Sequence, residues 1–169
     1  MSGTTGVDRI WRHLAKASFA VLGHVSATGE PRCSGVVYTM IDRRMFVVVA
    51  ADSWKARHIA EHARVAVTVP VRRGGIMSVF VPIPPATITF HGSAVVHLPT
   101  SVEAARALTA LAPLLPPERR ASCRVVEICP EGWFLTYGIG VPLMKMRDPA
   151  LARARVRVPE RPAAAPRPR

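Results

Sequence analysis

The fold is decided by the stretch from Ser18 to Val71, whose centre reads Ala51-Asp52-Ser53-Trp54-Lys55-Ala56-Arg57-His58. Around this centre, apolar runs rich in β-branched residues predict four strands, over residues 19–25, 32–41, 45–50 and 64–71. The centre itself predicts a helix from Trp54 to about Ala63, because Ser53 is a favourable N-cap residue. A short helix therefore interrupts a series of strands.

The start of this helix carries three groups that suit a phosphate. Ser53 supplies a hydroxyl, Lys55 an ammonium and Arg57 a guanidinium. The first turn of a helix also offers unpaired N–H groups and the positive end of the helix dipole. The pattern therefore predicts an anion-binding site. The alternative is a solvated helix face, where lysine and arginine are common.

The rest of the chain adds strands and few helices. Val7 to Ala17 predicts an amphipathic entry helix, and Ser101 predicts the N-cap of a helix that ends near Leu111. A further strand is expected over residues 86–97, and Gly92 suggests a bulge or bend in it; residues 123–130 and 132–137 are expected to form a last strand or hairpin. Prolines keep residues 76–85 out of a central position in a sheet. We therefore expect a mainly β fold, a closed barrel of about six strands with peripheral helices.

Length and charge suggest one domain with a basic tail. The chain has 169 residues and a net charge of +12. We predict a barrel domain over residues 1–147 and a largely disordered Pro/Ala/Arg-rich tail over residues 148–169. From Arg153 onward the tail has six arginines and a single acid, Glu160. Such a tail can rest on polyanions. The remaining charge is dispersed, so we predict no specific nucleic-acid partner.

The sequence predicts a cytoplasmic protein that does not enter a membrane. Its first residues lack the pattern of a signal peptide, and its most apolar run, Gly74 to Phe90, is interrupted by three prolines. Cys33, Cys123 and Cys129 form an odd set without a C-x-x-C pair, so we expect buried thiols and neither disulfides nor a zinc ribbon.

Two blocks of sequence resemble the pyridoxamine 5′-phosphate oxidase-like flavin-binding split β-barrels. Phe19-Ala20-Val21-Leu22, Thr28-Gly29-Glu30-Pro31 and Gly35-Val36-Val37-Tyr38 look like the Gly-x-Pro hairpin of that family. Ser53-Trp54-Lys55-Ala56-Arg57-His58-Ile59 and Ala63-Arg64-Val65-Ala66-Val67 look like its S-x-K-x-R-N-L…P-R-V-A-V block, with His58 for Asn and Ala63 for Pro. The resemblance covers residues 7–97 well and the rest loosely, and it implies a six-stranded split barrel.

The resemblance also implies a function. Such a protein is a homodimer that holds FMN or the deazaflavin coenzyme F420 between subunits and transfers hydride between this cofactor and a small organic substrate. By the same resemblance, the cofactor phosphate meets Ser53, Lys55 and Arg57, and the ring system is flanked by Arg32, Cys33, Ser34, Gly35 and Val36. No catalytic residue is assigned. The Trp…Arg-Leu-x-Pro ending of genuine pyridoxamine phosphate oxidases is missing, so we do not expect that activity.

Other interpretations of the same residues remain. The barrel can hold a flavin or haem without catalysis, or it can be the core of a basic nucleic-acid binder. The run from His58 to His62 matches the H-x-x-E-H pattern of a class of zinc peptidases, but no third ligand follows on a second helix, and we predict no metal site. We interpret His24, His91 and His97 as ordinary packed or rim histidines.

Overall fold

The computed structural model describes residues 3–72, 85–120, 122–142, 145–146 and 148–159, with side chains from residue 6 onward. The helices are α1 (Gly3–Lys16), α2 (Trp54–Glu61), α3 (Val102–Leu111), the 3-10 turn η2 (Ala112–Leu114), α4 (Pro117–Arg120) and α5 (Pro149–Ala152). The strands are β1 (Phe19–Val25), β2 (Pro31–Ile41), β3 (Arg44–Ala50), β4 (Arg64–Val71), β5 (Ala86–His97), β6 (Cys123–Tyr137) and β7 (Arg153–Arg157).

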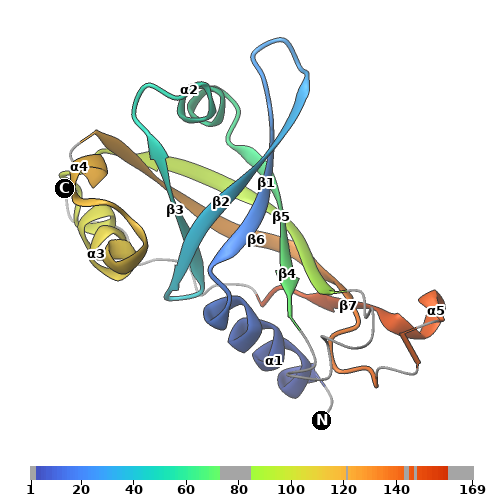
Figure 1. Ribbon diagram of the computed structural model, residues 1–169. Helices are drawn as coiled ribbons and strands as arrows, with labels where there is room; N and C mark the ends of the chain where they lie inside the picture. Colours follow the sequence, from blue (N-terminus) through green and yellow to red (C-terminus); the bar gives the residue numbers. More distant parts are fainter. Residues whose placement is uncertain (1–2, 73–84, 121, 143–144, 147, 160–169) are drawn as a thin grey trace.

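The strands form a closed antiparallel barrel (Figure 1). Their order is β3-β2-β1-β4-β5-β6-β7, and an additional pairing of β3 with β6 closes a ring of six strands. Strand β7 lies outside this ring, beside the second half of β6. The expected mainly β fold with a six-stranded barrel and peripheral helices is therefore confirmed.

The barrel is split between β2 and β3. These strands pair only from Tyr38 opposite Val47 to Ile41 opposite Arg44. Beyond Val47, β3 continues along β6, whereas residues 31–37 of β2 pair with β1 alone. Among the described residues, no strand pairs with the other edge of this half of β2. Backbone N–H and C=O groups along that edge are consequently available to a ligand.

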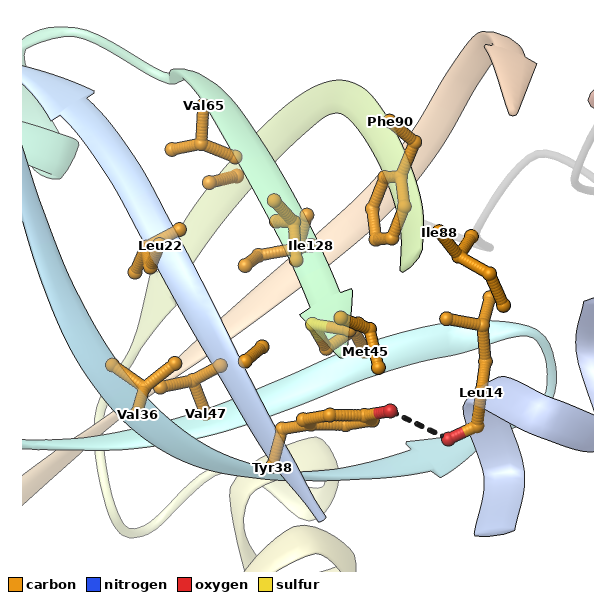
Figure 2. Close-up of a cluster of buried hydrophobic side chains, with 14 of the residues drawn as sticks. Leu14, Leu22, Val36, Tyr38, Met45, Val47, Val65, Ile88, Phe90 and Ile128 are labelled. Carbon is orange, nitrogen blue, oxygen red and sulfur yellow. Dashed lines mark hydrogen bonds between the residues drawn. The ribbon is translucent and has the colours of Figure 1, made fainter. Parts of the chain in front are cut away.

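Apolar side chains fill the barrel, as Figure 2 shows. Leu22, Val36, Val47 and Phe90 belong to a cluster that is buried almost completely. Helix α1 covers one end of the barrel, and α2 lies at the other (Figure 1). The hydroxyl of Tyr38 donates a hydrogen bond of 2.7 Å to the carbonyl oxygen of Leu14 near the end of α1, which ties this helix to the barrel.

The described part of the predicted tail differs from our expectation. Residues 149–157 form α5 and β7, and β7 pairs with β6 from Arg157 opposite Trp133 to Arg153 opposite Tyr137. Val156 packs against the core, and Val158 is buried. These apolar contacts order a segment that we expected to be disordered because of its arginines. Residues 160–169 lie outside the described residues, as do residues 76–84 of the expected irregular segment.

In the second half of the sheet, the expected last strand or hairpin is a single strand, since β6 runs continuously over fifteen residues. The bulge or bend expected at Gly92 lies just before that residue. The irregularity in register lies between Thr89 and His91, where β6 carries the additional residues and Gly132 adopts a φ of 67°. Gly92 instead permits a close approach of strands, because a Cβ there would overlap the carbonyl oxygen of Cys129. The cysteines are free, and Cys123 is buried as expected, whereas Cys33 is exposed.

Candidate functional site

Helix α2 begins as its sequence predicts. Ser53 has the extended backbone of an N-cap residue, and its Oγ accepts a hydrogen bond of 3.3 Å from the N–H of Ala56. Ala56 and Ile59 are buried and fix the helix on the end of the barrel. Because the Ser53 oxygen acts here as an acceptor, its hydroxyl hydrogen can still be donated to a ligand.

The two cations at this helix start have no ion-pair partner among the described residues. Lys55 is half-buried, and its ammonium lies 5.8 Å from the centre of the Trp54 ring. Arg57 is exposed. Ser53 accepts from the N–H groups of Ala56 and Arg57, whereas those of Trp54 and Lys55 have no hydrogen-bond partner among the described residues. Cations, hydroxyl and helix dipole thus favour an anion at this place, and the residues present fit the phosphate of a cofactor.

The five predicted residues of β2 do not share one face. Successive side chains of a strand point to opposite sides, so Arg32, Ser34 and Val36 lie on the side of the barrel interior, and Cys33 and Gly35 lie on the outer side. Val36 is part of the core, and the Arg32 guanidinium donates to the Glu30 carboxylate at 2.6 Å. A flat ligand along the unpaired edge of β2 can meet the backbone of all five residues, but the side chains of only some.

The outer face of the hairpin is unusually apolar for an exposed surface. Phe19, Val21 and Val37 are exposed there, with 47% of Phe19 accessible. The Phe19 ring lies across Gly35, where an added Cβ would approach a ring carbon to 2.9 Å. Glycine at this position therefore permits the close approach of this aromatic ring to the sheet. Contiguous exposed apolar side chains of this kind mark an interaction surface.

The sequence did not predict that His24 lies at the start of α2. His24 is only 3% exposed and lies beneath Trp54, with ring centres 5.2 Å apart and a stacked orientation. The His58 ring lies 5.6 Å from the His24 ring. Burial lowers the pKa of His24 below its ordinary value, and the positive charges of His58, Lys55 and Arg32 lower that pKa further. The alternation Ala20, Leu22, His24 in β1 was the available signal, since it places His24 on the interior side.

The structure gives no support to a zinc-peptidase site at the H-x-x-E-H run. His58 lies between Trp54 and His24, and His62 is an exposed residue at the end of α2. Within the described part of the chain, no group of three or more His, Cys, Asp or Glu residues is placed to hold a metal ion. No helix in that part is long and apolar enough to cross a membrane.

Comparison with known proteins identifies the architecture. No family model and no curated protein matches the sequence. Among solved structures, HutZ, the haem storage protein from Vibrio cholerae, superposes with a TM-score of 0.63 at 14% identity over 78% of this chain and 94% of HutZ. A putative pyridoxamine 5′-phosphate oxidase from Listeria innocua gives a TM-score of 0.55 at 18% identity over 73% of this chain and 92% of its own.

The chain has the pyridoxamine 5′-phosphate oxidase-like split-barrel fold. An F420 reductase also shares it, with a TM-score of 0.54 at 18% identity over 73% of this chain and 93% of the reductase. The split-barrel proteins that resemble this chain thus include flavin-, deazaflavin- and haem-related members. The fold is compatible with each of these cofactors.

Proposed function

We propose that this split-barrel protein is an oxidoreductase that uses FMN or coenzyme F420. The observation that supports this proposal most directly is the start of α2, where Lys55 and Arg57 lack ion-pair partners among the described residues and Ser53 can donate its hydroxyl hydrogen. In this proposal the three residues hold the cofactor phosphate. The similarity to an F420 reductase and to a putative pyridoxamine 5′-phosphate oxidase supports the same assignment.

In this proposal the ring system lies along the split of the barrel. The edge of β2 over residues 31–37, with which no described strand pairs, offers backbone donors and acceptors to the ring. The bound cofactor supplies hydride-transfer chemistry to a small organic substrate. The residues of this chain bind the phosphate, align the ring along β2 and present N–H groups that favour negative charge on the ring.

A homodimer is part of the proposal. The outer face of β1 and β2 exposes Phe19, Val21 and Val37 next to the unpaired edge, and a second copy of the chain would remove these side chains from water. Val37→Glu should then yield a monomer in light scattering, whereas Val102→Glu on α3, which is 74% exposed, should leave the dimer intact. A wild-type monomer, or a dimer that Val37→Glu does not affect, would contradict this interface.

The second candidate is a carrier that binds haem or flavin without turnover. The likeness to the haem storage protein HutZ supports it. Absorbance of the purified protein, followed by titration with FMN, F420 and haem, separates the two candidates by ligand. Single-turnover oxidation of the reduced cofactor by a panel of acceptors then separates catalysis from storage, because a carrier binds the cofactor but does not accelerate its oxidation.

The phosphate site is tested by the double variant Lys55→Ala/Arg57→Ala. Each charge-assisted contact contributes about 1.5–3 kcal/mol, and the exposure of Arg57 places its share at the low end. The expected loss is about 3 kcal/mol, or roughly a hundredfold in FMN or F420 affinity. Arg12→Ala/Lys16→Ala on α1 removes the same charges elsewhere and should leave the affinity unchanged. Equal affinity of the two double variants would refute the phosphate site.

Riboflavin provides a ligand control for the same test. It lacks the phosphate of FMN, so its affinity should not depend on Lys55 and Arg57. A parallel loss of riboflavin affinity would show that the double variant disturbs the ring-binding part of the site and not the phosphate contacts.

A further inference from the structure

Four buried polar atoms belong to neighbouring residues of β1, β2 and α2. They are Nδ1 and Nε2 of His24, Oγ of Ser34 and Nδ1 of His58, and none has a hydrogen-bond partner among the described residues. His24 and Ser34 lie on adjacent strands and on the same face, since His24 pairs with Arg32 and Leu22 pairs with Ser34. We call these three residues, with Trp54 stacked over His24, the His24 cluster.

The stability of the barrel does not require a polar group at this position. The neighbouring interior positions of β1 are Ala20 and Leu22, and an apolar side chain in place of His24 would continue that pattern. A buried donor or acceptor without a partner destabilises the folded protein. Departures from the local pattern of a core are expected where a ligand is bound. The unpaired atoms thus point to a ligand group that satisfies them.

The surroundings specify the charge of that group. The electrostatic potential at His24 is made more positive by three neighbours: His58 and Lys55 of α2, and Arg32 of β2. On the other side of β1, strand β4 presents Ala66 opposite Gly23, and the nearest charged residue of that strand, Arg64, pairs with Glu131 at 2.7 Å. No described carboxylate is paired with Lys55, and Glu30 is already bound to Arg32. An anionic group is therefore favoured.

We propose that the His24 cluster is the inner part of the cofactor site: Trp54 turns away from His24 as the anionic end of the cofactor enters, and His24 and Ser34 then hydrogen-bond that anion. Trp54 is 42% exposed and immediately follows Ser53, so its ring has room to move outward beside the phosphate contacts. This inference rests on the proposed function. It makes His24 a ligand-binding residue and Trp54 a lid.

Binding is then coupled to a proton. In the ligand-free protein, burial and the neighbouring cations favour the neutral imidazole, whereas an anion in contact with His24 favours the imidazolium. The protein takes up as much as one proton at His24 as it binds the anion. Affinity should accordingly rise as the pH falls, by up to about tenfold per pH unit in the range between the free and bound pKa values of His24.

The test is the pH dependence of cofactor affinity in His24→Gln. Dissociation constants of FMN and F420 are measured between pH 5.5 and 8.5 for the wild type, for His24→Gln and for His62→Gln, an exposed position on the same side of the barrel. The FMN phosphate has its own pKa near about 6, which weakens binding at low pH, so the contribution of His24 is the difference between variants. We expect His24→Gln to bind the cofactor at least tenfold more weakly than the wild type at pH 6, and this gap should shrink as the pH rises. His62→Gln should match the wild type at every pH.

Calorimetry of the wild type gives a second readout that does not depend on the folding of a variant. The observed enthalpy of binding is compared in two buffers of different ionisation enthalpy, and proton uptake near pH 7 is expected. The inference would be overturned if binding takes up no proton at any pH, or if His24→Gln has the affinity and the pH dependence of the wild type. The unpaired atoms would then be assigned to buried water, and the phosphate site would remain in place. A wild type that binds neither cofactor would instead refute the proposed function, and the inference with it.

Discussion

Replacement of His24 by leucine should stabilise the protein while it abolishes tight cofactor binding. Two unpaired buried nitrogens at about 1–3 kcal/mol each are removed. Against this, the variant loses the stacking on Trp54, worth about 0.5–1.5 kcal/mol, and imperfect packing costs about 1 kcal/mol. The expected balance is a gain of about 2 kcal/mol, or roughly 4–8 °C in Tm for a chain of this size.

The gain should grow at acidic pH. The folded-state pKa of His24 lies below its ordinary value of 6.5, so below that pH the unfolded chain binds a proton that the folded chain does not. The wild type therefore loses stability as the pH falls through this range, and His24→Leu does not share that loss. The difference in free energy of unfolding between the two proteins should be larger at pH 5.5 than at pH 7.5.

Urea unfolding followed by circular dichroism at both pH values measures these differences. His62→Leu serves as the control, because His62 is exposed and its replacement should change stability little at either pH. If His24→Leu is less stable than the wild type at pH 7.5, the imidazole nitrogens already have partners. If the difference does not widen at pH 5.5, His24 is not a buried neutral group.

Two further predictions concern the barrel that supports the site. Tyr38→Phe should lower the free energy of unfolding by about 1–2 kcal/mol, because the Leu14 carbonyl oxygen loses its hydrogen-bond donor. If urea unfolding gives the variant the stability of the wild type, this hydrogen bond does not stabilise the contact between α1 and the barrel. Burial raises the pKa of Tyr38, so the wild type should lose stability above about pH 10, where the unfolded chain loses the phenol proton, and Tyr38→Phe should lose less. Gly92→Ala should lower the free energy of unfolding by at least about 2 kcal/mol, because the added Cβ overlaps the Cys129 carbonyl oxygen. A variant with the urea midpoint of the wild type would contradict this prediction.

The strands were predictable where one face is buried and the other is not. The bounds of β1, β4 and β5 agree with the sequence at both ends, because alternating apolar residues and flanking turn residues determine them. Helix α2 was predictable from one capping residue, Ser53. In these segments the local sequence and the tertiary packing favour the same structure, so no long-range information was needed.

Strand β7 was not predicted, because the many arginines of the tail suggest disorder although apolar residues alternate with them. The sequence from Arg153 to Val158 alternates arginine with Ala154, Val156 and Val158, which is the pattern of an edge strand with one buried face. The composition of the whole tail, rich in proline and arginine, is typical of disorder and conflicts with this local period. The sequence leaves open whether residues 123–137 form one strand or a hairpin, because the pairing of β6 with β5 accommodates the irregularity near Gly132 and no local pattern reveals that pairing.

The site residues of β2 illustrate what a contiguous motif cannot specify. A run of five residues was expected to flank a ring, yet strand geometry sends Val36 into the core and Gly35 to the outer face, and only the backbone of the run is continuous along the open edge. The same alternation carries His24 to the interior from the paired strand, where sequence alone suggested ordinary packing. A one-residue slip of β2 against β1 would exchange these faces, so the pairing that builds the core also decides which groups face α2. Core packing and the candidate site therefore depend on the same register.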